Sequence, residues 1–360
     1  MGKERLERYS LVGPEGERAA AAGLVDGDWF RSEVPRARMK QLMRRSDGPA
    51  IRDTALWIGL MAVTGAGGAL LWGSWLAVPL FLVYGILYGS ASDSRWHESG
   101  HGTAFATRWM NDALYQVASF CIMRDPTVWR WSHARHHTDT LIVGRDPEIA
   151  AMRPARLARI CANLLGLVDV PLAMRDMVLH ASGRLREDER TFIPESQAGK
   201  VYRTARIWVA IYVAVGAGCV LTGSLLPVVL IGGPRLYGTF MHIVYGLTQH
   251  AGMGENVLDH RLNTRTVLLG PIHRFLYWNM NYHVEHHMFP MVPYHRLPEL
   301  HDEINHDLAP AYPSLVAAYR EIIPAILRQL KDQSYYIRRD LPPDAAPFHR
   351  ISDGTAQPYG

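Results

Sequence analysis

The feature that most constrains this chain is a long stretch without charge. From Thr54 to Ser92, 39 consecutive residues include no Lys, Arg, Asp or Glu. A helix needs about 20 apolar residues to cross a bilayer, and buried helices of soluble proteins rarely exceed about 25 residues. The stretch is long enough for two spans, which we predict at about residues 54–72 and 75–92, with a break near Gly73-Ser74. Two spans return the chain to the side on which it started.

A second apolar region covers residues 207–254 and contains a single Lys, Arg, Asp or Glu, Arg235. It predicts two further spans, at about residues 206–224 and 226–248. A charge at membrane depth is costly and usually faces a polar cavity. Either the fourth span begins later than residue 226, or Arg235 lines a reaction cavity, and the sequence leaves both open.

The residues before the first span are polar and basic. We expect residues 1–30 to form an extended arm. Residues 31–45 contain six basic side chains and one acid, Glu33, which is typical of the cytoplasmic flank of a membrane span. These features predict an all-α membrane protein with about four transmembrane helices, and hence the lipid bilayer as a partner.

The predicted spans divide the chain into three parts. Residues 1–50 are expected to form a polar and basic N-terminal arm, residues 51–310 a membrane-embedded domain, and residues 311–360 a C-terminal helix followed by a flexible tail. Two further stretches, 109–130 and 155–182, mix apolar with charged residues. Such stretches are typical of helices that lie on the membrane surface.

Histidines recur at helical spacing in three places. One H-x-x-x-H and two H-x-x-H-H patterns begin at His97, His133 and His283. Residues three and four positions apart share a helix face, so each pattern can direct two or three imidazoles toward one point. The eight imidazoles exceed the four ligands that zinc usually takes. They predict a cytoplasmic, histidine-rich domain that binds a pair of metal ions.

A ninth histidine, His250, follows the last predicted span on the same side as these patterns, whereas His242 is a weaker candidate. The predicted metal ligands are His97, His101, His133, His136, His137, His250, His283, His286 and His287. Nine imidazoles give two ions four or five ligands each. Imidazole binds iron, copper, zinc and nickel alike, so the residues by themselves leave the metal open.

Two alternatives to this site stay open. Carboxylate-bridged di-iron proteins use Glu-x-x-His pairs, and Glu98–His101 and Glu303–His306 have that spacing. The second pair lies beyond the last histidine pattern, which disfavours this interpretation. A metal-storage protein is the other alternative, but storage does not require three ordered patterns.

Charge and cysteine content exclude other classes of protein. The net charge of +4 is too small to indicate a nucleic-acid partner. The three cysteines, Cys121, Cys161 and Cys219, form no C-x-x-C pair. They therefore indicate neither a disulfide framework nor an iron–sulfur site.

The histidine patterns resemble those of a known family. The segment His283-Val284-Glu285-His286-His287-x-Phe289-Pro290, followed by Pro293 and Leu297-Pro298-x-Leu300-His301, is similar to bacterial members of the membrane-bound fatty acid desaturase and hydroxylase superfamily. The resemblance covers roughly residues 50–310. His283 stands where desaturases with a fused cytochrome usually have Gln, and no His-Pro-Gly-Gly haem motif occurs, so the resemblance is to the desaturase branch without a fused cytochrome.

The resemblance implies an enzyme. It implies two iron ions held by the nine histidines, O2 as co-substrate, and removal of hydrogen from an unactivated C–H bond. Desaturation of a fatty acyl chain is the leading hypothesis. A hydroxylase or desaturase of a small metabolite, such as a dihydrorhizobitoxine- or rhizopine-like compound, is an alternative, and a non-catalytic membrane metal-binding protein is another. We predict that Glu98, Asp139 and Glu285 orient ligand imidazoles.

The resemblance also implies partners and a location. Because no electron-delivering domain is recognisable in the sequence, we expect a ferredoxin, rubredoxin or cytochrome with its reductase. Arg124, Arg130 and Arg145 are candidates for docking an acidic carrier. The expected location is the inner membrane of a bacterium, as a multi-pass protein whose active site faces the cytoplasm.

Overall fold

The computed structural model describes residues 6–347, and within that part of the chain the regular structure is helical. The helices formed by the long apolar regions are α4 (Asp47–Leu70), α5 (Ala77–Gly85), η1 (Ile86–Ser90), α11 (Glu195–Thr222), α12 (Leu226–Leu230), α13 (Pro234–Tyr237) and α14 (Phe240–His250). The other helices are α2 (Glu15–Ala21), α3 (Arg36–Leu42), α6 (Ala91–His101), α7 (Arg108–Cys121), α8 (Pro126–Thr138), α9 (Leu157–Asn163), α10 (Asp169–Ala181), α15 (His260–Asn263), α16 (Pro271–Tyr277), α17 (His283–Met288), α18 (Leu297–Ile304) and α19 (Leu315–Gln329), with short 3₁₀ turns η2 (Glu189–Thr191), η3 (Tyr294–Arg296) and η4 (Asn305–Asp307). Apart from two isolated bridges, residues 6–347 contain no β-structure, so the predicted all-α class is confirmed for them.

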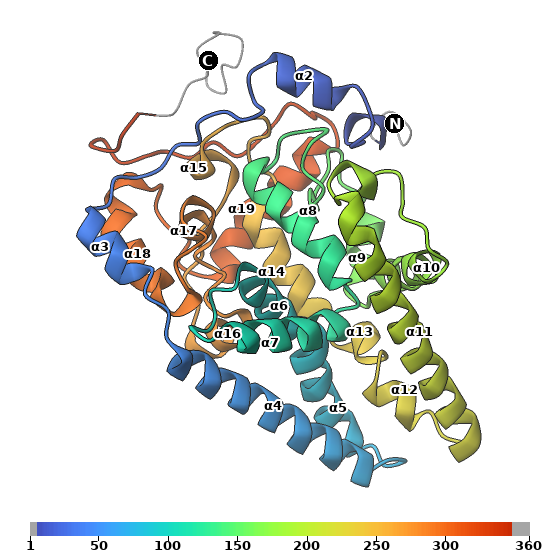
Figure 1. Ribbon diagram of the computed structural model, residues 1–360. Helices are drawn as coiled ribbons and strands as arrows, with labels where there is room; N and C mark the ends of the chain where they lie inside the picture. The colour runs from blue at the N-terminus through green and yellow to red at the C-terminus, as the bar shows by residue number, and fades with distance from the viewer. Residues whose placement is uncertain (1–5, 348–360) are drawn as a thin grey trace.

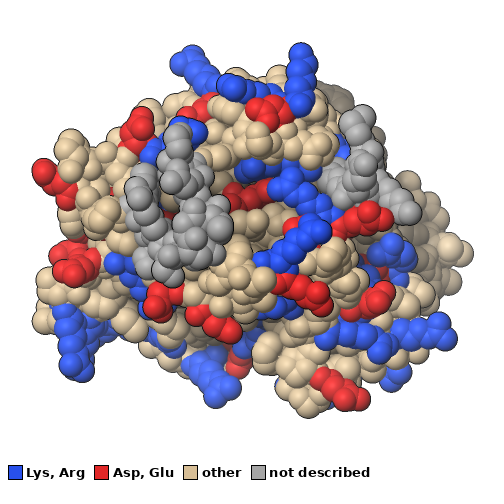
Figure 2. Space-filling model, turned by 90° about the horizontal axis from the view of Figure 1, so that it is seen from above, with Lys and Arg blue, Asp and Glu red and all other residues tan. Residues whose placement is uncertain are grey.

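Two helical stretches are long and apolar enough to cross a membrane, Arg36–Leu70, which includes α4, and α11. Figure 1 shows α4, α5, α11 and α12 projecting together from one end of the molecule. Large apolar side chains are exposed there, with Leu70 and Leu221 each 86% exposed. The opposite end, seen from above in Figure 2, carries Lys and Arg interspersed with Asp and Glu. This polarity fits one end in a bilayer and one in water, while four complete spans stay a prediction.

The predicted second span continues directly into the first histidine pattern. Helix α5 passes through the π-helical segment η1 into α6 without leaving a helical path. The residue just before the π-helical segment, Gly85, lies where two segments approach very closely: a Cβ atom at Gly238 would come within 2.0 Å of the backbone of Gly85. Only glycine permits this contact, which packs α13 and the residues after it against η1.

The predicted fourth span is not one helix. It consists of α12, α13 and α14, with breaks at residues 231–233 and 238–239. The physical reason lies in its proline and glycine content, because Gly232 has φ +83° and Pro234 begins α13. Proline favours the first turn of a new helix and glycine the turn before it. Helix α14 therefore starts at Phe240, fourteen residues later than the predicted start at 226.

The N-terminal arm is not extended throughout. Residues 15–21 form α2, and Ala19 and Leu24 pack with Ile142 and Leu258 in a small apolar cluster. Nearby, Arg8 forms an ion pair with Glu255 at 2.7 Å. Burial of these apolar side chains, which an extended arm in water would leave exposed, explains the difference. The boundaries at residues 50 and 310 stay predictions, and the tail predicted to be flexible lies largely in residues 348–360, outside the described residues.

Candidate metal centre

The nine predicted ligands come together in two neighbouring groups. The five-histidine group contains His97, His101, His133, His137 and His286, and the four-histidine group contains His136, His250, His283 and His287. In each group the ring nitrogens that could bind a metal all lie within 4.8 Å of one another. The stacked rings of His137 and His287, whose centroids are 4.4 Å apart, connect the two groups. Among residues 6–347, both groups consist of histidines alone, so the carboxylate-bridged alternative has no Glu in either.

Helical geometry explains how one pattern serves both groups. Side chains four positions apart lie on nearly the same helix face, whereas adjacent side chains are separated by about 100°. On α8, His133 and His137 therefore point to the five-histidine group, and His136 points to the four-histidine group. On α17 the assignment is reversed, because His283 and His287 belong to the four-histidine group and His286 to the other. The repeated H-x-x-H-H pattern is what allows α8 and α17 to share two sites.

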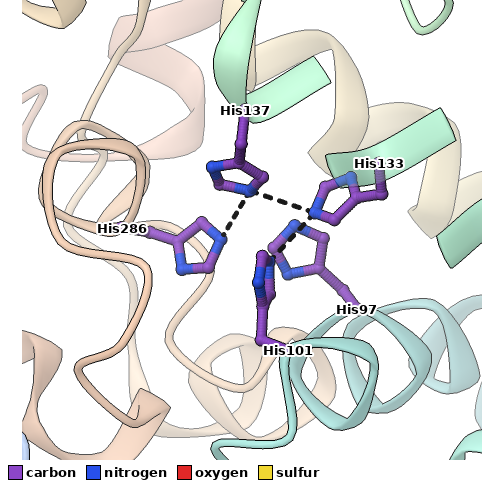
Figure 3. A group of neighbouring side chains, drawn as sticks. All are labelled: His97, His101, His133, His137 and His286. Atoms are coloured by element: carbon purple, nitrogen blue, oxygen red, sulfur yellow. Dashed lines mark hydrogen bonds between the residues drawn. The ribbon is translucent and has the colours of Figure 1, made fainter. Parts of the chain in front are cut away.

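The imidazoles of the five-histidine group converge on one point (Figure 3). The Nε2 atom of His133 lies 3.1 Å from those of both His101 and His137, and the Nε2 atom of His137 lies 3.2 Å from that of His286. In the four-histidine group, the Nε2 atoms of His283 and His287 are 3.2 Å apart. Nitrogens this close compete for the same few protons, whereas a metal ion accepts all of them as ligands.

Two further observations fit a metal at each group. The buried Nε2 atoms of His97 and His250, one in each group, have no hydrogen-bond partner. Burial and the neighbouring histidines hold the pKa well below its ordinary value for most of the set: His97, His101, His137, His250, His283, His286 and His287. Neutral imidazole is the form that binds metal. The donor set therefore fits two divalent transition-metal ions of the kind that imidazole prefers.

Two carboxylates hold ligand imidazoles from outside. The Nδ1 atom of His136 lies 2.9 Å from Asp146, and that of His133 lies 3.0 Å from Glu148. Asp146 also accepts hydrogen bonds from the backbone N–H groups of Leu141 and Glu148. Burial acts to raise the pKa of Glu148, but the contact with His133, together with the charges of His136 and Arg124, outweighs burial and lowers the pKa to about 2. Sequence reasoning missed both acids, although each lies in the Asp-Pro-Glu segment just after the second histidine pattern.

The three carboxylates predicted for this role have other partners. Glu98 accepts hydrogen bonds from Thr103 and the backbone of Tyr294, Asp139 pairs with Arg145 and Arg135, and Glu285 binds Thr266 and His301. None of these partners is a predicted ligand. Glu98 and Glu285 are each next to a ligand in sequence, and adjacent side chains on a helix point about 100° apart. Asp139 lies two residues after His137, at the end of α8, and points to the arginines instead.

A cavity of about 500 Å³ opens beside both groups. His97, His133, His136 and His283 form part of its wall, and Arg235 forms another part. Helix α14 starts later than residue 226, and Arg235 lines this cavity, so the two features considered for Arg235 occur together. Figure 1 places α13, which carries Arg235, between the projecting helices and the histidine-bearing helices α6 and α14.

Two other polar residues of this wall differ from their predicted roles. His242 is not in either metal group; its Nδ1 atom lies 3.1 Å from Asp93. Arg124 also pairs with Asp93, at 2.7 Å, and packs on the rings of Trp96 and Trp129. Its guanidinium therefore lines the cavity, which does not fit a docking role at the surface. The side chains of Arg130 and Arg145 are 49% and 29% exposed and keep that role as a prediction.

Comparison with known proteins agrees with this geometry. A family model described as fatty acid desaturase matches residues 73–319, more than half of the chain. A protein named Probable fatty acid desaturase DES1, from Sorghum bicolor, is 24% identical over 298 residues, which cover 75% of this chain and 72% of that protein. The chain belongs to the fatty acid desaturase family, and the predicted resemblance to this superfamily is confirmed. It is therefore an oxidoreductase with a fatty acid desaturase-like function.

Proposed function

We propose that this chain is an oxygen-dependent membrane oxidoreductase that uses two iron ions to remove hydrogen from an aliphatic chain, with desaturation of a fatty acyl chain as the leading reaction. The observation that carries the proposal is the pair of buried histidine groups. Nine buried or half-buried imidazoles, with no carboxylate in either group, suit two transition-metal ions better than a purely structural role. Family membership selects iron among the metals that imidazole binds.

Each group would hold one ion through its own histidines. When bound, the two irons supply the activation of oxygen that attack on an unactivated C–H bond requires. The remaining work belongs to side chains of this protein. Asp146 and Glu148 hold the rings of His136 and His133 in orientation, because a hydrogen bond at Nδ1 leaves Nε2 free for metal.

Apolar rings exclude water from the same site. Trp96 is 3% exposed, and its ring centroid lies 5.6 Å from that of His133 and 6.1 Å from that of His97. A water-poor wall of this kind protects an oxidising site from side reactions. The substrate would enter the 500 Å³ cavity, which reaches His97 and His133 as well as His136 and His283 of the other group.

The proposal includes a location and an electron source. Two long apolar helices support a location in a membrane, and the basic residues 31–45 favour the cytoplasmic side for the histidines. The proposed protein has four spans and lies in the inner membrane of a bacterium. A ferredoxin, rubredoxin or cytochrome with its reductase would deliver the electrons. We do not assign a nucleic-acid partner.

A second candidate function follows from the lining of the cavity. Asp93, Arg124, Arg235 and His242 give it more charge than an acyl chain requires. This observation favours a small polar metabolite as substrate, for desaturation or hydroxylation. A non-catalytic metal-binding protein is the remaining alternative, and it would bind metal without consuming oxygen.

The test compares cells that express the chain together with a ferredoxin system against cells that express His136→Ala. Mass spectrometry of lipids and polar metabolites should find a product lighter by two hydrogens only with the unaltered chain. A product heavier by one oxygen would make the enzyme a hydroxylase. On the purified protein, metal analysis should find iron, and reduction should start oxygen uptake. Bound metal without oxygen uptake, even with the ferredoxin system present, would contradict the proposed enzyme.

A further inference from the structure

The cavity beside the histidines has a charged inner end. Its volume of about 500 Å³ lies within the range of small-molecule sites. Trp129, Met177 and Trp208 provide apolar surface. Asp93, Arg124, Arg235 and His242 are neighbours on the inner wall, so one occupant would meet both kinds of surface.

The two arginines of the inner wall differ in their partners. Arg124 and His242 both contact Asp93, at 2.7 and 3.1 Å, so this carboxylate is already shared. Arg235 has no ion pair with any residue between 6 and 347. Its Nη1 donates to the carbonyl of Gly89 at 2.7 Å and to Thr239 Oγ1 at 2.8 Å, and its Nε has no partner. Arg124 therefore has a carboxylate partner in Asp93, whereas Arg235 has none among residues 6–347.

The nearby carboxylate of Asp169 is not an ion-pair partner of Arg235. Asp169, which also acts on Arg235 electrostatically, lies 3.4 Å from Arg159 and is 38% exposed. Arg235 itself is 5% exposed. A buried cation that lacks a counter-charge is unfavourable unless an anion joins it. Arg235 is thus a buried cation without an ion-paired carboxylate among the described residues.

An uncharged aliphatic chain would make this worse. Methylene groups that fill the cavity would remove water from Arg124, Arg235 and Asp93 and return no hydrogen bond. A carboxylate, in contrast, matches the planar guanidinium and accepts from its unpartnered N–H. The chemistry of this wall therefore calls for an occupant with an anionic end and an apolar remainder.

We propose that the substrate carries a free carboxylate that binds Arg235, with its aliphatic part directed to the histidines. This rests on the proposed function for the reaction and adds the substrate class, a free aliphatic acid. The position of Arg235 also sets a length. Arg235 is anchored at Gly89, which precedes His97 by eight residues in a continuous helical path, or roughly 12 Å. The reacting carbon thus lies several methylene groups from the carboxylate.

The test measures binding rather than turnover. Iron-loaded, oxidised protein in lipid nanodiscs is titrated calorimetrically with octanoate and with octanamide, and empty nanodiscs correct for partition into lipid. Octanoate should bind at least about tenfold more tightly than octanamide, since hydrogen bonds to charged groups are worth that much. Arg235→Gln should reduce this ratio to about one. Arg235→Lys, which keeps the charge but loses the planar fork, should retain part of it.

A matched control separates Arg235 from general positive charge. Arg156→Gln makes the same change at the exposed end of the same cavity and should leave the octanoate-to-octanamide ratio as it is. Equal affinities of the two probes for the unaltered protein would overturn the proposal. An unchanged ratio in Arg235→Gln, with iron content and melting temperature retained, would overturn it too. If Arg235→Gln does not fold, an unchanged ratio in Arg235→Lys decides against it.

The outcome also separates this inference from the proposed function. A chain that binds no iron and takes up no oxygen contradicts the proposed function, whatever the octanoate titration gives. A chain that holds iron, takes up oxygen and prefers octanamide or shows no preference keeps its function and loses the proposed substrate class. In that case an acyl ester or thioester, which carries no free carboxylate at the chain end, is the better substrate.

Discussion

The two histidine groups are built from the same helices but are held differently. In the four-histidine group, the Nδ1 atoms of His136, His250 and His287 lie within 3.1 Å of Asp146, the carbonyl of Asn263 and Thr140, respectively. In the five-histidine group, Glu148 holds His133, whereas the Nδ1 atoms of His97, His137 and His286 have no partner. The group with fewer ligands has the more complete outer support. Hydrogen bonds thus orient the imidazoles of the four-histidine group, whereas the five-histidine group depends on its larger number of ligands and on the packing of their rings.

Removal of one ligand from each group should give the largest effect and the clearest contrast. His283→Ala leaves the four-histidine group with three imidazoles, while His286→Ala leaves the other group with four. Both changes should abolish turnover. Metal analysis should find that His283→Ala loses more iron, because fewer ligands remain on the ion. Equal iron loss from both variants would mean that the groups bind as one unit.

Substitution of the outer carboxylates should give a smaller effect. Asp146→Asn removes the charge behind His136, and Glu148→Gln the charge behind His133. Changes of this kind typically cost about 10- to 100-fold in metal affinity or activity. We expect Asp146→Asn to be the more damaging, because Asp146 also accepts two backbone hydrogen bonds. Competition with a chelator measures both affinities, and a larger effect of Glu148→Gln would reverse the comparison.

Asp125 provides a change that should affect both groups equally. It caps α8, which supplies ligands to both, by accepting from the N–H groups of Thr127 and Val128. Burial raises the pKa of its carboxyl from the ordinary 3.8 to about 6. The folded protein therefore binds this proton more tightly than the unfolded chain does. The resulting stability is complete below about pH 4 and is lost as the pH rises through 6.

The corresponding variant is Asp125→Asn, which keeps a capping side chain without the titration. From pH 4 to 7 the unaltered protein should lose about 1–2 kcal/mol of stability relative to this variant, because one pKa unit corresponds to about 1.4 kcal/mol and partial solvent contact reduces the effect. Melting temperatures of both proteins across this pH range measure the difference. Parallel curves would show that Asp125 does not titrate in the folded state.

The smallest effect should come from the N-terminal arm, and on one group only. The ring of Trp29 stacks on His260 with centroids 4.2 Å apart, and His260 lies 5.0 Å from His287. Trp29 also donates to the carbonyl of Thr138. Trp29→Ala should lower stability by about 1 kcal/mol. Iron should be lost preferentially from the four-histidine group. Leu6→Ala, which removes an exposed apolar side chain from the same arm, is the control.

Much of this site could be predicted because its signal is local. The spacing of His133, His136 and His137 is a property of five residues, and helix periodicity converts it into a shared direction. The same applies to the charge-free residues 54–92, whose composition alone indicates a membrane. By contrast, the roles assigned to Glu98 and Asp139 depended on sequence adjacency. Adjacency does not indicate contact on a helix, and these two side chains point elsewhere.

The sequence by itself determined the class of protein, the nine imidazoles and the two long apolar helices, because each depends on residue type and short-range period. Only the tertiary structure decided how α8 and α17 divide their histidines between two groups. It also decided that Asp146 and Glu148 support them, and that Arg235 faces a cavity. The division of the histidines and the position of Arg235 depend on where chain segments over 100 residues apart meet, whereas the contacts of Asp146 and Glu148 depend on how the loop after α8 folds back against that helix. Such meetings follow from the packing of whole helices, which no local pattern records.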